Sequence, residues 1–377
     1  MITGRSSFGR RLSVDWVLVL SLIPLAGAGL VTMHSFDGSG YFFTRQLVFL
    51  VIGFCVFFGA SFLDWRLLRR GGVLMALYGF FLLLLGILLL GGERIQGAKS
   101  WLSFGSFTVQ PADFVKILLV AMLAKYFSRR HVEIAHFQHI LVSGIYTLIP
   151  FLLVALQPDF GSAVIIFCIW FALIIVSGVS KKHLAIVFTL LLCAMLTLWL
   201  FVFADYQKAR LISFVEPMSD IHGSGYNAFQ SQIAVGAGEL LGKGVGYGTQ
   251  SRLEFLPEYQ TDFIFAAFVE EWGLVGAVIM LSLYGVIIVR VLLVSRAGAT
   301  NFESLFGIGI ATMLISHITI NIGMNVGLLP VTGLTLPFVS YGGSHLVTEF
   351  LGLGILMGMR RYGRESRLVE REVDLSS

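Results

Sequence analysis

The stretch FIFAAFVEEWGLVGAVIMLSLYGVIIVRVLLV, residues 263–294, decides the fold class, because almost every side chain in it is apolar. About 20 apolar residues in a helix cross the roughly 30 Å hydrocarbon core of a bilayer. This longer run therefore predicts a spanning helix that tilts or extends beyond the bilayer. A carboxylate, Asp262, stands directly before it in the segment FLPEYQTDFIF, residues 255–265.

Nine further apolar runs predict an all-α polytopic membrane protein with ten spans, forming one domain over residues 1–377. Hydrophobic residues make up 56% of the 377 and charged residues 13%, with a mean hydropathy of +0.86. Soluble proteins carry about twice that charged share, roughly 25%. The first run follows Arg10 and Arg11 without a convincing cleavage site, so we interpret it as an uncleaved span. The predicted spans are 16–33, 47–63, 72–90, 111–126, 140–155, 161–179, 184–203, 263–294, 305–324 and 345–359.

Basic residues set the orientation of this predicted bundle. Most of the 26 Lys and Arg residues fall in short connections on one side, so the positive-inside rule places both termini in the cytoplasm. We interpret the basic tail, 360–377, as a cytoplasmic lipid-surface anchor. The outer side has two long connections, about 91–110 and 204–262, and a Gly- and Pro-rich segment, 325–344. Irregular backbone at membrane depth must be buried in protein or line a wet cavity, so we expect the functional site at this outer face.

Asp262 has two interpretations. Thr261 and Asp262 precede a helical run, and both residue types are good helix N-caps. Alternatively, Asp262 is a general base for a hydroxyl nucleophile, which requires it to reach the proton that it removes. The sequence leaves both open.

Two more segments carry charged groups near the predicted outer face. In QPADFVK, residues 110–116, Asp113 and Lys116 are spaced to pair on one helix face. That pair is either structural or places Lys116 toward an anionic head group. Asp159 lies in the short loop QPDFG, residues 157–161, and serves either a tight turn or the outer site.

Other polar patterns exclude some functions. The glycine-rich tract 234–251 fails the phosphate-binding loop pattern and lacks a potassium-filter context, but its glycines let backbone approach a bulky polar ligand. Adjacent Glu270 and Glu271 point about 100° apart on a helix, so at least one must face a cavity or a basic partner. Neither the histidine-rich segment nor the cysteines has the spacing of a metal site: His131, Glu133, His136 and His139; Cys55, Cys168 and Cys193.

Taken together, five segments resemble the SEDS family (shape, elongation, division, sporulation), in the same order over nearly the whole chain. The tract 234–251 is closer to the RodA branch than to the division branch. The five segments are GAKSW (97–101), QPADFVK (110–116), QPDFG (157–161), FLPEYQTDFIFA (255–266) and GLLPVTGLTLPFVSYGGS (327–344).

The resemblance implies a peptidoglycan glycosyltransferase that polymerises lipid II at the outer face of the bacterial cytoplasmic membrane during elongation. Asp262 matches the essential outer-loop aspartate of the family. Asp113 with Lys116 matches its charged pair, and Asp159 matches its Gln-Pro-Asp loop. The substrate-binding residues that we expect are Lys99, Trp101, Gln110, Lys116, Asp159, Gln230, Arg252, Glu258, Ser340, Gly342 and Ser344.

This chain departs from the family pattern at three places. Ala112 and Asp113 replace the usual Ser-Glu, which shortens the pairing carboxylate and removes a hydroxyl. Gln260 stands where a His usually precedes Thr-Asp. The serine pair often seen after Tyr-Gly-Gly is Ser344-His345 here.

The implied reaction joins a sugar 4-hydroxyl to an anomeric carbon and expels a lipid pyrophosphate. Asp262 would be the base, and the configuration at the anomeric carbon would invert. Lys99, Lys116 or Arg252 would neutralise the leaving group. No nucleotide is needed, because the pyrophosphate link is already activated. Whether the reaction also uses a divalent cation is left open, although no cluster of ligand residues indicates one.

Two alternatives remain open. The same cavity and charges would suit a flippase of a lipid-linked cell-wall precursor, and the chain could instead be a scaffold that activates a partner. The partner that the resemblance implies is a class B penicillin-binding protein, a single-span transpeptidase, docked through the eighth and ninth spans, together with other elongation-complex proteins.

Overall fold

The structure of this chain is a computed structural model that describes most of its residues. The helices and strands discussed below all lie within this described part. The described ranges are 14–36, 40–69, 71–91, 100–104, 107–129, 137–180, 182–183, 185–189, 196, 200, 224–253 and 255–374.

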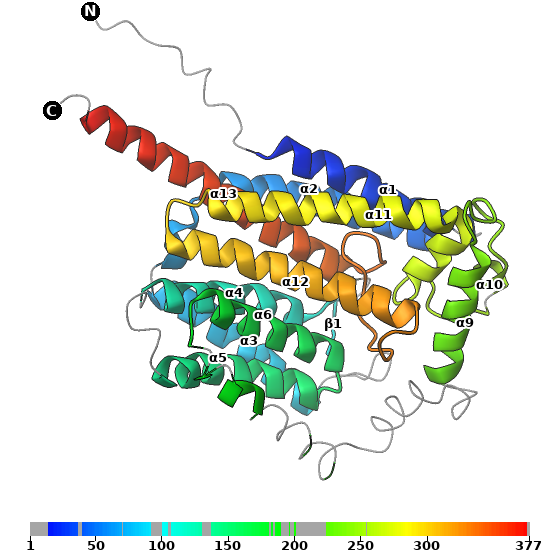
Figure 1. Cartoon of the computed structure of the whole chain (residues 1–377), viewed down its shortest axis with the longest axis horizontal. Coiled ribbons are helices and arrows are strands. Elements are labelled where there is room, and N and C mark those ends of the chain that lie inside the picture. The colour runs from blue at the N-terminus through cyan, green and yellow to red at the C-terminus, as the bar shows by residue number, and fades with distance from the viewer. Residues whose placement is uncertain are drawn as a thin grey trace, which may run out of the picture.

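The fold is a bundle of long helices that run side by side, with α9 and α10 beyond one end of it (Figure 1). Helix α1 begins and α13 ends at the opposite end, on the left of Figure 1. Helix α12 packs against α4, α6, α11 and α13, while α13 also packs along α2. The elements are α1 (Trp16–Phe36), α2 (Tyr41–Phe62), the 3₁₀ helix η2 (Trp65–Arg69), α3 (Gly71–Gly91), β1 (Leu102–Phe104), β2 (Phe107–Val109), α4 (Pro111–Ser128), α5 (Phe137–Leu156), α6 (Phe160–Val176), α9 (Ser224–Ala237), α10 (Thr249–Arg252), α11 (Ile264–Arg296), α12 (Asn301–Asn325) and α13 (Gly343–Asp374).

Hydrophobicity explains why these helices form the bundle. Six of the described helices, α1, α2, α3, α5, α11 and α12, are long and apolar enough to cross a bilayer. Helix α6 is apolar but shorter, at 17 residues. In lipid, a helix satisfies every backbone hydrogen bond within itself. The chain is therefore a multi-pass membrane protein.

Helix ends depart from the predicted spans in several places. Helix α2 begins at Tyr41, ahead of the predicted 47–63, and α12 begins at Asn301, ahead of 305–324. Helix α13 continues to Asp374, beyond the apolar part 345–359, because the polar residues that follow still favour a helix. Most of the predicted span 184–203 lies outside the described residues, so the count of ten spans stays a prediction.

The prediction of one continuous helix over 263–294 is wrong at Gly273. That residue interrupts α11 with a φ of 65° and a ψ of −167°, a conformation open mainly to glycine. The loop 238–244 inserts at the break: the Lys243 and Gly244 amides donate to the carbonyls of Glu270 and Glu271, at 2.9 and 3.0 Å. In return, the amides of residues 274 and 275 donate to the carbonyls of residues 239 and 240, at 2.9 and 3.1 Å. The insertion thus supplies hydrogen bonds that a broken helix would otherwise lack.

An ion cluster ties three helices together at the other end of the bundle. Asp15, directly before α1, is buried and forms a two-pronged contact with the Arg290 guanidinium of α11, at 2.6 to 3.1 Å. Arg360 of α13 donates to the same carboxylate at 2.9 Å. Two guanidinium groups that share one buried carboxylate fix the start of α1 against α11 and α13.

Candidate functional site

The turn that carries Asp262 is held in place through its backbone. The Asp262 carbonyl accepts hydrogen bonds from the side-chain amides of Asn321 and Asn325, both at 3.0 Å. Ser340 donates its hydroxyl to the Thr261 carbonyl at 2.6 Å. These bonds fix the turn against α12 and against the segment that follows α12.

The N-cap interpretation of Asp262 and Thr261 is wrong. The cap position of α11 belongs to Phe263, whose side chain makes no capping hydrogen bond. Phe263 occupies it because the carbonyls of the preceding residues are already engaged by α12 and Ser340. Asp262 therefore lies one residue before the cap position of α11.

A glycine lies under the Asp262 carboxylate. A Cβ atom on Gly333 would lie 3.5 Å from Asp262 Oδ2, and Gly333 has a φ of +72°. Asp262 itself is half-buried. The carboxylate therefore lies over a stretch of backbone with no side chain, which leaves space beside it for a ligand.

The irregular segment 327–342 connects α12 to α13, and its buried backbone groups are bonded to side chains. Asn321 donates to the Leu334 carbonyl at 2.6 Å, and Tyr284 donates to the Pro337 carbonyl at 2.5 Å. Gln46 of α2 donates to the Ser340 carbonyl at 2.9 Å. Non-helical backbone persists inside a membrane protein only when such partners satisfy it.

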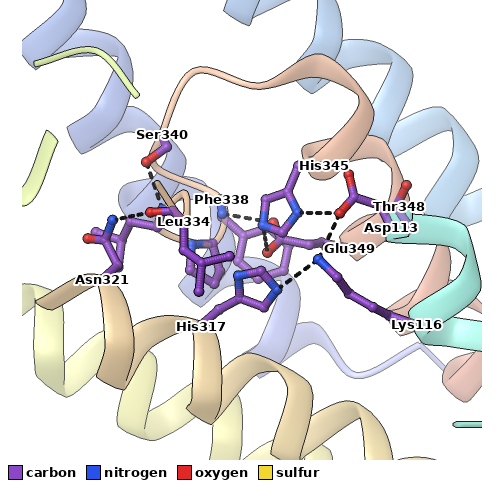
Figure 2. A network of polar contacts seen from close by, with 12 residues as sticks. Asp113, Lys116, His317, Asn321, Leu334, Phe338, Ser340, His345, Thr348 and Glu349 are labelled. Carbon is purple, nitrogen blue, oxygen red and sulfur yellow. Dashed lines mark hydrogen bonds and ion pairs between the residues drawn. The ribbon is translucent and has the colours of Figure 1, made fainter. Parts of the chain in front are cut away.

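A cluster of five charged or ionisable side chains lies beside this segment (Figure 2). Lys116 Nζ contacts Asp113 Oδ1 at 3.0 Å and lies 3.5 Å from His317 Nε2. His345 contacts Asp113 through Nδ1 at 3.4 Å and Glu349 through Nε2 at 2.9 Å. We call these residues the α4–α13 charge cluster. All five are buried, so their charges are compensated by one another rather than by water.

The contacts suggest how this cluster reaches neutrality. The cluster holds two carboxylates and one ammonium: Asp113 pairs with Lys116, and Glu349 pairs with His345. A proton on one imidazole makes the charges of the cluster sum to zero. His345 is placed to carry that proton because it contacts both carboxylates. Glu349 also accepts the Phe338 amide at 3.0 Å, which links the cluster to the segment 327–342.

Helix α12 connects this cluster to Asp262. His317 of the cluster and Asn321, which binds the Asp262 carbonyl, are four residues apart on α12 and so share one face. Figure 2 shows both side chains pointing from α12 toward the segment 327–342. One helix face thus carries both features.

A second polar group joins α4, α6 and α13. The Gln110 amide side chain donates to Asp159 Oδ2 at 2.7 Å, and the Gln110 backbone amide donates to Ser344 Oγ at 3.0 Å. Asp159 also caps α6 by accepting the Ser162 amide at 3.0 Å. The turn interpretation of Asp159 is therefore correct, and its other oxygen is bound to a second residue that we expected in the site.

Other expected residues lie away from these contacts. Arg252 is exposed on α10, and Gln230 is half-buried on α9. Glu258 is exposed and accepts the Thr261 hydroxyl at 3.0 Å. Trp101 is half-buried just before β1. Lys99 lies outside the described residues.

Glu270 and Glu271 are both buried, and both face the glycine-rich tract. Glu270 pairs with Lys243 at 3.0 Å and accepts the Gln250 amide at 3.0 Å. Glu271 accepts the Gly246 amide at 2.6 Å. The expected basic partner is thus Lys243, and the two carboxylates anchor the tract 234–251 to α11.

Within the described ranges, no group of three or more His, Cys, Asp and Glu side chains is placed to hold a metal ion. His139 is buried and lies 2.9 Å from the Tyr126 hydroxyl. The rest of the predicted histidine-rich segment, 131–136, and Cys193 lie outside the described residues.

Five polar residues of this site were missed or not assigned a role from sequence: Gln46, His317, Asn321, Asn325 and Glu349. A usable signal exists for three of them. His317, Asn321 and Asn325 recur every four residues within an apolar helix. A polar stripe of that kind in a membrane helix points into the protein.

Comparison with known proteins adds a family model. The model, FTSW_RODA_SPOVE, described as "Cell cycle protein", matches residues 11–365. Stage V sporulation protein E of Bacillus subtilis (strain 168) is 34% identical over 94% of this chain and 99% of its own length. Peptidoglycan glycosyltransferase MrdB of Escherichia coli (strain K12) is 39% identical over 72% of this chain and 73% of its own length.

Two solved structures are also similar to this chain. A chain in a structure of a peptidoglycan synthase complex, concerned with the coordination of polymerization and crosslinking, superposes with a TM-score of 0.80. It is 31% identical and covers 93% of this chain and 98% of that one. The rod shape determining protein RodA of Thermus thermophilus superposes with a TM-score of 0.70, at 30% identity over 93% of this chain and 98% of that one.

Proposed function

The chain belongs to the family of the cell cycle proteins FtsW, RodA and SpoVE, the SEDS family, and on that premise we propose that Asp262 is the general base with which it polymerises lipid II. The protein is a peptidoglycan glycosyltransferase. We assign its reaction to the end of the bundle that carries α9, α10 and the Asp262 turn.

The observation that supports this role is the position of the Asp262 carboxylate over Gly333, on a turn whose carbonyl is bound twice by α12. A general base must be held within hydrogen-bond reach of the proton that it removes. Here two hydrogen bonds from α12 fix the backbone of the turn that carries the carboxylate. Glycine at position 333 leaves room for the sugar that carries the reacting hydroxyl.

The proposed step conserves atoms and charge. The acceptor 4-hydroxyl gives its proton to the Asp262 carboxylate while its oxygen bonds to the anomeric carbon of the donor. The bond from that carbon to the pyrophosphate oxygen breaks, and its electron pair leaves with the lipid pyrophosphate. Attack opposite the leaving group inverts the anomeric configuration.

Two cations expected in the site differ in their access to a leaving group. Arg252 is exposed on α10, close in sequence to the Asp262 turn, so we assign it to the departing pyrophosphate. Lys116 is buried and already paired with Asp113. We therefore assign Lys116 to positioning: it fixes α4 against α12, which holds Asp262. Lys99, Trp101 and Gln230 remain predicted substrate contacts.

Orientation and partners complete the proposal. We place the end at which α1 begins and α13 ends in the cytoplasm, with ten spans as one domain in the bacterial cytoplasmic membrane and the connection 204–262 outside it. A transpeptidase partner, a class B penicillin-binding protein, is supported by the similarity to a chain of a peptidoglycan synthase complex. We assign the activity to elongation because the MrdB relative and the RodA structure are among the similar proteins.

A polymerisation assay with purified protein and lipid II tests the role of Asp262. Removing a general base slows a reaction by about 100- to 10,000-fold, so Asp262→Ala and the isosteric Asp262→Asn should both lose glycan synthesis while keeping the melting temperature of the parent. Full polymerisation by Asp262→Asn would refute the assignment. Movement of lipid II across a vesicle membrane without polymer would favour the flippase, and polymer made by the transpeptidase partner alone would favour the scaffold.

A further inference from the structure

A pocket of about 260 Å³ lies where α12 begins. Helix α12 begins at the end of the bundle opposite α9 and α10 (Figure 1). The pocket is several times larger than the roughly 30 Å³ that one water molecule occupies in the liquid. Its walls come from η2, from the end of α4 and from the start of α12. The residues that line it are Arg69, Lys125, Ser128, Arg129, Thr300, Asn301 and Phe302.

Three of these side chains are cationic, and the described part of the chain pairs none of them with a carboxylate. The Arg129 guanidinium donates instead to the Arg69 carbonyl at 3.4 Å. By contrast Arg66, also on η2, is neutralised by Asp64 at 2.7 Å. Arg69, Lys125 and Arg129 therefore concentrate positive charge around one cavity, and they repel one another until an anion enters.

The start of α12 adds donors to the same cavity. Glu303 accepts the Ala299 amide at 2.8 Å, and the Thr300 hydroxyl caps α12 by accepting the Glu303 amide at 3.5 Å. This arrangement turns the nearest carboxylate toward its own backbone. Asn301 and Phe302, the first two residues of α12, also line the pocket. The amides of the first turn of a helix have no acceptor within the helix.

The geometry points to a binding site for a phosphate group, and its position in the bundle favours an anionic phospholipid head group as the source. The pocket lies at the ends of membrane helices, where head groups are found. Leu63 and Leu67 on the same connection as Arg69 are about half exposed, at 57% and 48%, as expected for side chains that contact acyl chains. Basic pockets between helices on the cytoplasmic side bind anionic lipid head groups.

The test is lipid retention by the purified full-length protein, measured by native mass spectrometry with phosphatidylglycerol and with phosphatidylcholine. We expect selective retention of phosphatidylglycerol. Each basic side chain near an anionic surface contributes about fivefold, so Lys125→Gln/Arg129→Gln should bind about 25-fold more weakly. The matched control is Arg66→Gln, which removes a cation already paired with Asp64 and should bind like the parent.

Three results would overturn the proposal or part of it. Equal retention by the parent and the Lys125→Gln/Arg129→Gln variant would refute the site. Loss of binding in the charge-preserving Lys125→Arg/Arg129→Lys variant would refute the charge argument. Displacement of phosphatidylglycerol by inorganic phosphate at millimolar concentration would keep the phosphate chemistry but refute the lipid as its source.

Discussion

Asn321 donates its side-chain amide to the backbone carbonyl of Asp262 at 3.0 Å, and to the Leu334 carbonyl at 2.6 Å. One buried side chain therefore binds both the turn that carries the proposed base and the segment that lies beneath its carboxylate. The relative position of Asp262 and Gly333 therefore depends on α12. The geometry of the candidate site is thus set by a helix in the middle of the bundle.

The first prediction concerns that amide. Asn321→Ala should lower the turnover number of polymerisation by about 10- to 100-fold, because small displacements of a catalytic group cost rates of that order. The KM for lipid II should change less than the turnover number. The measurement is a steady-state polymerisation assay. Thr312→Val on the same helix is the control, because the Thr312 hydroxyl donates only to its own helix, at the Ile308 carbonyl; an equal loss there would contradict the positioning role.

The second prediction concerns the α4–α13 charge cluster. Lys116→Met should lower the free energy of unfolding by about 3–5 kcal/mol, because it leaves the buried Asp113 carboxylate without its ammonium. Asp113→Leu should do the same for Lys116. The double variant should lose less than the sum of the two, which is the mark of a direct interaction. Strictly additive losses in thermal unfolding experiments would show that the two side chains do not interact.

Local sequence patterns predicted much of this fold. Apolar runs predicted the helices. The spacing of Asp113 and Lys116 predicted an ion pair, and the structure contains it. The family resemblance identified the motif segments 255–266 and 327–344; their contact at Ser340 and Thr261 was not predicted and comes from the structure. What these predictions share is that each depends on neighbours in sequence or on a known family pattern.

The interruption of α11 could not be predicted in this way. Gly273 lies in an apolar run, where an isolated glycine is compatible with a helix. The break exists because the loop 238–244 inserts its backbone there. Likewise, Glu349 meets the Phe338 amide only because the segment 327–342 folds back against α13. Both features depend on contacts between segments that no local pattern encodes.

The third prediction concerns pH and the Asp15 cluster. Burial alone would raise the pKa of Asp15, but the Arg290 guanidinium, the Leu18 amide and the Arg360 charge together hold it below its ordinary value of 3.8. A carboxyl group with a lowered pKa stabilises the fold when ionised, so its contribution is complete above that ordinary value and is lost as the pH falls below it. Asp15→Asn should therefore cost about 2 kcal/mol of unfolding free energy at neutral pH, the usual order for hydrogen bonds to a charged group.

The pH series decides whether the ion cluster is responsible. The difference in stability between the parent and Asp15→Asn should shrink as the pH falls below 3.8. A gap that stays constant down to strongly acidic pH would contradict the assignment. Asp64→Asn is the control, because its exposed pair with Arg66 should contribute about 0–1 kcal/mol at any pH.

The last prediction concerns the loop that inserts at the break in α11. A Cβ atom on Gly242 would lie 2.1 Å from the Glu271 carbonyl oxygen, and Gly242 has a φ of +80°. Gly242→Ala should therefore expel the loop, lower the melting temperature and expose residues 238–250 to protease, because both the space and the backbone conformation exclude a side chain.

Gly236→Ala is the matched control: a Cβ there meets nothing within 4 Å, and the residue lies in α9. Alanine in a helix is favoured over glycine by about 1 kcal/mol, so this variant should be as stable as the parent or more so. If Gly242→Ala melts like Gly236→Ala and resists protease equally, the loop does not stabilise the interruption of α11.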